Sequence, residues 1–196
     1  LAFLEGSGYM ARIGFIMGNG PDFALMLASI ARIGAIAIPI SIMIRANELV
    51  RVLRQSDVQG LVVQRTMLGK DLVERVMEAL PELAGQESGA IRLARAPYLR
   101  WIVSTGEGLP ACVAPMAFLT EPAASLGEDL LREVESEVHP TDQAVEIYTS
   151  GSMALPKGVK HHHGPVLFRS HTMVEMLSYN AGQRVPCMLP MFWVGG

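Results

Sequence analysis

The residues best suited to chemistry lie in one stretch, residues 148–164, which reads YTSGSMALPKGVKHHHG. It follows an apolar, strand-forming run and combines glycines, hydroxyl side chains, lysines and histidines. Gly151 and Gly158 allow the backbone to turn sharply and to approach a ligand closely. Backbone N–H groups, hydroxyls and lysine are groups that can hold phosphate oxygens. The combination predicts a phosphate-binding loop with the candidate ligands Thr149, Ser150, Ser152 and Lys157.

Other interpretations of this stretch stay open on composition alone. A Walker loop would place Gly before the lysine and Ser or Thr after it, whereas Pro156 and Gly158 stand there. The simplest alternative is a solvated Gly/Ser turn between a strand and a helix. The run at 161–163 is three histidines, which invites a metal site. Zinc sites need further ligands at set spacings, and no Cys or Glu cluster lies near in the sequence, so we assign no metal site.

Short apolar strands that alternate with helices are expected to position the loop. Runs that are apolar on both faces favour an α/β fold, in which a mostly parallel sheet carries helices on both sides. Ligands of such sheets bind in loops that lead from a strand into a helix, and we expect the 148–164 stretch to be such a loop. The expected strands are residues 12–17, 35–38, 60–63, 98–103, 144–148 and 185–189. The expected helices are residues 21–34, 47–55 with Asn47 as its cap, 71–80, 125–138 and 164–177, with loops at 85–89 and 105–126.

Residues 23–44 are long and apolar enough to suggest a membrane span. Arg32 lies near the middle of this run, and Gly34 and Pro39 interrupt it. A central arginine is costly in a bilayer, and Gly and Pro punctuate secondary structure. We therefore expect a buried helix followed by a short strand that stops at Pro39. No integral membrane span is expected, and peripheral association stays open.

Composition bounds the class of protein. The chain has 196 residues, of which 50% are hydrophobic, and a formal net charge of −3. These values predict one globular domain or most of one, without the basic excess typical of nucleic-acid binding. Cys112 and Cys187 lie far apart, which favours reduced thiols in a cytoplasmic protein, although one bridge between them stays open. The chain starts at Leu1 and ends at Gly196 without a polar tail, so we expect both ends to be cuts through a longer protein.

Several ordered motifs resemble the adenylate-forming (AMP-dependent) synthetase/ligase superfamily, and acyl-CoA synthetases in particular. YTSGSMALPKGV is similar to the family's phosphate-binding signature, and HHHG follows where the family has H-x-H-G. RIGFIMGNGPDFALMLASIARIGAIAIPI is similar to an early strand–Asn–Pro–helix–Gly–Pro stretch, and VPCMLPMFWVGG to a segment that lines the acyl pocket. The resemblance implies that residues 1–196 are a partial N-terminal (AMP-binding) domain, truncated at both ends, with the C-terminal lid domain absent.

The resemblance also implies an activity, that of an ATP-dependent carboxylic acid–CoA ligase. Such an enzyme joins an acid, here expected to be a fatty acid, to the α-phosphate of Mg-ATP and then transfers the acyl group from acyl-AMP to coenzyme A. ATP, Mg²⁺ and coenzyme A are the implied cofactors and co-substrates. By position, the ATP-binding residues would be Thr149, Ser150, Gly151, Ser152, Met153, Ala154, Lys157 and Gly158. The acyl channel would be bordered by Phe192, Trp193, Val194 and Gly195, and no catalytic residue is assigned.

Two positions depart from the family pattern, which has Ser or Thr and then Gly after Ser152. Met153 lacks a hydroxyl, and Ala154 brings a Cβ into a tight loop, which costs on the order of 1 kcal/mol if the position needs a positive φ. We expect weaker ATP binding than in a typical member. The sequence has no YGxTE-like or TGD segment, so the isolated chain is expected to be inactive.

Two alternatives to the ligase stay open. The first is a non-catalytic remnant or interaction module that keeps the scaffold with a degenerate phosphate loop, and Met153 and Ala154 are its support. The second is an unrelated nucleotide-binding α/β protein such as a kinase, which the failed Walker pattern disfavours. ATP binding separates the first alternative from the ligase.

Overall fold

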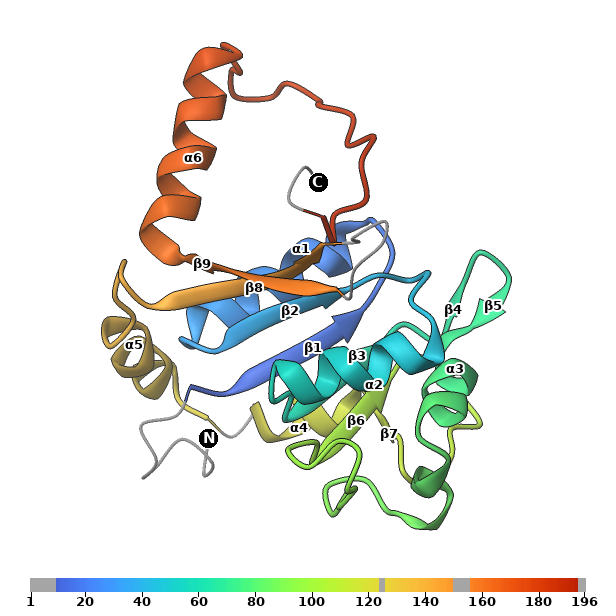
Figure 1. The fold of residues 1–196 in the computed structure, drawn as a ribbon. Helices are drawn as coiled ribbons and strands as arrows, with labels where there is room; N and C mark the ends of the chain where they lie inside the picture. Colours follow the sequence, from blue (N-terminus) through green and yellow to red (C-terminus); the bar gives the residue numbers. More distant parts are fainter. Residues whose placement is uncertain (1–9, 124–125, 150–155, 194–196) are drawn as a thin grey trace.

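The computed structural model describes residues 10–123, 126–149 and 156–193. One seven-stranded sheet dominates it, in the order β7-β6-β3-β1-β2-β8-β9, with a small β4-β5 ribbon beside it (Figure 1). Neighbouring strands from β7 to β8 are parallel, and β9 is antiparallel to β8. The expected α/β class with a mostly parallel sheet is confirmed.

The bounds of the elements are as follows. The strands are β1 Arg12–Ile16, β2 Ile36–Ile40, β3 Gly60–Val63, β4 Thr66–Met67, β5 Lys70–Asp71, β6 Trp101–Ser104, β7 Ala114–Pro115, β8 Gln143–Thr149 and β9 Lys157–His162. The helices are α1 Pro21–Arg32, α2 Ala46–Gln55, α3 Leu72–Ala79, α4 Ala117–Ala123, α5 Glu128–Ser136 and α6 His163–Met176, and Pro81–Gly85 forms a 3₁₀ turn.

Helices cover both faces of the sheet, as the apolar strands predict. Successive residues of a strand point to opposite faces. Ile36 and Ile38 of β2 therefore join one apolar cluster with side chains of α2 and α3, while Ala37 joins a second cluster with side chains of α1. Strands that are buried on both sides need apolar residues at every position, which explains why β2 and β3 read as unbroken apolar runs.

The apolar run at 23–44 folds as α1 followed by β2, as expected. Within the described part of the chain, no helix combines the length and the apolar character that a membrane crossing requires. Arg32 at the end of α1 pairs with Glu135 of α5. The prediction that the strand stops at Pro39 is wrong, because β2 continues to Ile40. The Ile36 N–H points toward β1, and backbone N–H groups alternate in direction along a strand, so the backbone of Pro39 faces β8. The pairing of β2 with β8 stops at Ala37. The missing N–H of proline therefore breaks no hydrogen bond of the ladder.

Several boundaries differ from those expected. Asn47 does not cap α2, because the cap position is Arg45, whose N–H donates to the Glu48 carboxylate. Part of the expected loop at 105–126 forms β7 and α4, and the helix expected at 125–138 is shorter. Both cysteines are free, with Cys112 buried and Cys187 exposed.

The two larger errors lie near the candidate site. Residues 157–162 form the strand β9, so the candidate loop joins two antiparallel strands rather than a strand and a helix. Residues 185–189 form no strand. The segment instead runs back from α6 toward the carboxyl ends of the central strands without pairing to them (Figure 1). Val185 and Met188 are 52% and 85% exposed, so their apolar character marks no buried position in the described structure.

Candidate phosphate-binding site

The β8–β9 hairpin holds the two ends of the candidate phosphate loop side by side. Thr149 is paired with Lys157 across the ladder, and Tyr148 with Gly158. The Thr149 hydroxyl lies 3.5 Å from the Lys157 carbonyl oxygen. Five of the predicted ATP-binding residues lie outside the described residues, namely Ser150, Gly151, Ser152, Met153 and Ala154. The structure thus places the three outer members, and it brings all three to the mouth of one hairpin.

A pocket of about 260 Å³ adjoins the hairpin mouth at the carboxyl ends of β2 and β8. Thr149 and Pro156 line it from the hairpin, and Phe192 and Trp193 line it from the C-terminal segment. The remaining lining residues are Pro39, Ile40, Ser41, Met43, Ile44, Glu48, Val52 and Tyr148. Thr149, which is expected to bind phosphate, therefore shares a pocket with Phe192 and Trp193, which are expected to border the acyl channel, although they are more than 40 positions apart in the sequence. Val194 and Gly195 lie outside the described residues.

Asn19 positions the C-terminal side of this pocket, a role that sequence reasoning missed. It lies in the loop between β1 and α1, and its amide nitrogen donates to the Leu189 carbonyl at 2.8 Å. Its amide oxygen accepts from the Met191 N–H, also at 2.8 Å. Phe192 then buries its ring against the core, at 3% exposure, and meets Trp193 edge to face with ring centroids 5.6 Å apart. The sequence signal was the polar residue between two glycines after a buried strand.

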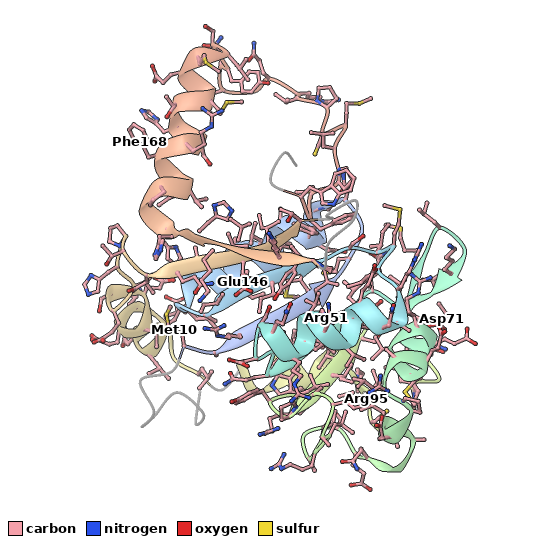
Figure 2. All side chains as sticks on the ribbon, viewed as in Figure 1. Met10, Arg51, Asp71, Arg95, Glu146 and Phe168 are labelled. Carbon is pink, nitrogen blue, oxygen red and sulfur yellow. The ribbon has the colours of Figure 1, made fainter. Side chains whose placement is uncertain are left out.

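A buried polar cluster lies under the hairpin and was also missed. Glu146 is 4% exposed, and its Oε1 accepts from the Tyr148 hydroxyl at 3.0 Å and the Ser56 hydroxyl at 3.2 Å. The two hydroxyl oxygens are 2.7 Å apart, so the two hydroxyl protons are shared among three short oxygen–oxygen contacts. Burial is the main reason that the pKa of Tyr148 rises to about 12. In Figure 2, Glu146 lies on the side of the sheet that faces α2.

Gly158 is required by this cluster rather than by its backbone conformation. A Cβ built on Gly158 would lie 2.2 Å from Glu146 Oε1 and 3.1 Å from Tyr148 Cζ. The hairpin backbone therefore rests directly on the carboxylate and the phenol ring. The predicted close approach of Gly158 to a ligand stays a prediction, and the neighbours that the described structure shows are Glu146 and Tyr148.

The three consecutive histidines lead into α6. His161 pairs with Val145 in the ladder, and the His162 Nδ1 lies 2.7 Å from the Thr141 carbonyl oxygen. His163 is the first residue of α6. In the described ranges no three His, Cys, Asp or Glu side chains gather closely enough to hold a metal ion.

Comparisons with known proteins bear on the whole chain. Residues 2–196 match the family described as AMP-binding enzyme. The chain is 26% identical over 190 residues to the 3-hydroxybenzoate–CoA/4-hydroxybenzoate–CoA ligase of Thauera aromatica, covering 96% of this chain and 32% of that protein. It is 25% identical over 174 residues to the mitochondrial medium-chain acyl-CoA ligase ACSF2 of Rattus norvegicus, covering 87% and 28%.

A solved structure shares the fold. The acetoacetyl-CoA synthetase of Streptomyces lividans superposes with a TM-score of 0.69 at 16% identity, over 98% of this chain and 28% of that one. The chain thus spans about a third of the length of the curated relatives that it matches. With the family match over nearly every residue, the chain belongs to the AMP-binding enzyme family.

Proposed function

We propose that this chain supplies the phosphate-binding part of an ATP-dependent carboxylic acid–CoA ligase. In the first step a carboxylate oxygen bonds to the α-phosphorus of ATP, the bond to pyrophosphate breaks, and acyl-AMP forms. In the second step the coenzyme A sulfur bonds to the acyl carbon, its proton is lost, and AMP leaves. The observation that carries the proposal is the shared pocket, because it brings Thr149 beside Phe192 and Trp193.

The proposed role of the hairpin mouth is electrostatic. Thr149, Lys157 and the loop between them would hold the β- and γ-phosphates and stabilise the negative charge that develops on the departing pyrophosphate. Lys157 is exposed and so is free to reach a ligand without a desolvation cost in the unbound chain. Mg²⁺ would enter as part of the substrate Mg-ATP, since Mg²⁺ is commonly held by substrate phosphates and one or two carboxylates. Glu48 is a carboxylate that lines the pocket and fits such a partner.

The acid is proposed to be apolar, and a fatty acid in particular. The wall opposite the hairpin consists of Phe192, Trp193 and aliphatic residues at the end of β2, which favour an apolar acyl group. The relatives named above act on hydroxybenzoates and on medium-chain acids, so both aromatic and aliphatic acids are represented. We further infer a reducing compartment such as the cytoplasm, because Cys112 and Cys187 are free thiols.

Titration with non-hydrolysable acyl-AMP analogues tests this proposal. Trp193 lines the pocket at 41% exposure, so its fluorescence should report binding. We expect saturable changes in emission with an aliphatic acyl-sulfamoyl adenosine and weaker binding of the benzoyl analogue. Trp193→Phe is the control, because it should lose most of the signal while Trp101 keeps its own. If neither analogue shows saturable binding, the proposal of a ligase is contradicted.

The isolated chain is expected to bind nucleotide without catalysing adenylation, since it spans about a third of its relatives. Formation of pyrophosphate from ATP and octanoate by these 196 residues would contradict that expectation. The second candidate is a non-catalytic remnant or interaction module, and the observation that favours it is Met153 and Ala154 in the loop. Restoring the family residues with Met153→Thr and Ala154→Gly separates the two. Tighter ATP binding in the double variant would support a weakened ligase loop, whereas no binding in either chain would favour the remnant.

A further inference from the structure

Glu146 is an unusual residue for the middle of a buried strand. Its side chain is 5% exposed, and its Oε2 accepts no hydrogen bond among the described residues, lying 3.8 Å from Arg12 Nη1. A buried carboxylate is costly to remove from water, and its partners rarely make it more favourable than an apolar side chain of similar size. Stability alone therefore does not account for Glu146.

Both ends of the candidate loop rest on this carboxylate. Tyr148 stands two residues before the loop at 150–155, and its hydroxyl is 3.0 Å from Glu146 Oε1. Gly158 stands three residues after the loop, and its backbone approaches the same oxygen so closely that a methyl group would lie 2.2 Å from it. The ladder pairs Tyr148 with Gly158 directly. One oxygen atom thus contacts the strand that enters the loop and the strand that leaves it.

The same cluster connects the hairpin to the rest of the fold. Ser56 is the residue that ends α2, and its hydroxyl joins Glu146 to Tyr148. Arg12 of β1 donates to the Ser56 carbonyl at 3.3 Å and pairs with Glu146. Tyr148 also lines the pocket beside Thr149, so fixing its hydroxyl fixes one wall.

We propose that Glu146 is a positioning residue for Thr149 and Lys157, the facing residues at the hairpin mouth that are candidates to bind ATP. Through Tyr148 and Gly158 it sets the separation and orientation of the two loop ends, and through Ser56 it ties them to α2. This inference rests on the proposed function for its purpose, while the anchoring itself is a property of the described residues and can be measured separately.

Amide hydrogen exchange tests the anchoring without any ligand. In Tyr148→Phe and Glu146→Gln, amides of the β8–β9 ladder are expected to exchange about fivefold faster, the factor that one ordinary hydrogen bond is worth. Amides of β1 and β3 should keep their rates. Tyr179→Phe is the matched control, because Tyr179 lies beyond α6 at 40% exposure and its variant should leave the hairpin unchanged.

Mg-ATP affinity tests whether the anchoring of the loop ends serves nucleotide binding. Tyr148→Phe should raise the Kd for Mg-ATP about fivefold, and Glu146→Gln by at least as much, because each loosens the loop ends. Val76→Ala removes a fully buried side chain in α3 that takes no part in the hydrogen bonds of Glu146, and it should lower Tm while leaving the Kd unchanged at a temperature where every variant is folded. A merely structural role would make affinity follow Tm in all of these chains.

A rescue experiment tests the contact at Gly158 even if one variant folds poorly. Gly158→Ala should accelerate exchange in the ladder strongly in the parent chain. The same substitution should have a smaller effect in a Glu146→Ala chain, because the oxygen that the new methyl group meets has been removed. Equal effects of Gly158→Ala in the two backgrounds would overturn the proposed contact.

The outcomes separate this inference from the proposed function. Unchanged ladder exchange in both Tyr148→Phe and Glu146→Gln would overturn the positioning role, whatever the chain binds. Faster exchange together with weaker Mg-ATP binding supports both ideas. Faster exchange in the two variants, together with no binding of Mg-ATP by the parent chain, would support the anchoring and contradict the proposed function.

Discussion

The central sheet and the C-terminal part of the chain bury their side chains very differently. In β1, β2 and β3 nearly every residue is shielded, and Phe15 and Leu61 are 0% exposed. Among the described residues from 156 onward, Phe192 alone is buried. Figure 2 shows Phe168 of α6 pointing away from the sheet, and Phe168 is 72% exposed. Backbone pairing with β8 and helix formation, rather than side-chain burial, account for the order in the second part.

Truncating one phenylalanine in each part is the most direct way to break this comparison. Phe15→Ala removes a ring that packs edge to face on Phe23 with centroids 4.9 Å apart. We expect it to lower the free energy of unfolding by about 3–5 kcal/mol. Phe168→Ala should change it by less than about 0.5 kcal/mol, because little area is buried there. Urea titrations of both variants measure the difference, and similar losses would contradict the contrast.

The capping of helices sharpens the comparison with a smaller effect. Asp71 caps α3, with its Oδ1 accepting from the Val73 N–H at 2.9 Å and the Glu74 N–H at 3.0 Å, whereas His162 at the start of α6 makes no side-chain cap. Asp71→Ala should therefore cost about 1 kcal/mol of unfolding free energy. His162→Ala should cost clearly less. A larger loss for the histidine variant would show that α6 is held by contacts of its first residues.

The stability that the Asp71 cap contributes should also depend on pH. Burial, the largest single influence, raises its pKa, but hydrogen bonds from the Glu74 N–H and from Arg65 outweigh it and leave the pKa below the ordinary 3.8. The carboxylate therefore stabilises the fold fully above that value, and this contribution is lost as the pH falls through the lower folded pKa. Unfolding measured across the acid range should show this loss in the parent and not in Asp71→Ala.

Alkaline pH tests the junction of the two parts, where the hairpin meets the sheet. Tyr148 has its pKa raised from 10.0 to about 12, chiefly by burial. The native state holds this proton more tightly than the unfolded chain, so the stabilisation is complete below the ordinary pKa and is lost as the pH rises from 10.0 to about 12. Tyr148→Phe should flatten the alkaline limb of the stability profile. An unchanged slope of stability against pH would mean that ionisation of the phenol is not linked to folding.

The same contrast explains what could be predicted from sequence. Apolar periodicity predicted β1, β3 and α1 well, because burial of those residues decides their structure. It failed at β9, where KGVKHH has no buried face and the strand exists through pairing with β8. It failed again at 185–189, where apolar residues suggested a strand that has no neighbour to pair with. Hydrophobic pattern identifies buried elements and carries no information about backbone partners.

The candidate site divides in the same way. Local motif chemistry named Thr149, Lys157 and Gly158 as candidate phosphate ligands, which stays a prediction, and the structure adds that Phe192 and Trp193 share a pocket with Thr149. Asn19 and the cluster of Ser56, Glu146 and Tyr148 were missed, because their meaning depends on contacts across 90 or more positions of sequence. Glu146 was the detectable signal, since a carboxylate inside an apolar strand must have partners.

Calorimetric titration of Mg-ATP into the parent chain, Lys157→Ala and Lys70→Ala tests the central claim most directly. Lys157 pairs with Thr149 at the hairpin mouth, whereas Lys70 lies in β5 of the separate two-stranded ribbon. The account predicts saturable binding by the parent, about tenfold weaker binding by Lys157→Ala because a charge-assisted contact to phosphate is lost, and unchanged binding by Lys70→Ala. No binding by the parent, or equal effects of the two lysine variants, would contradict it.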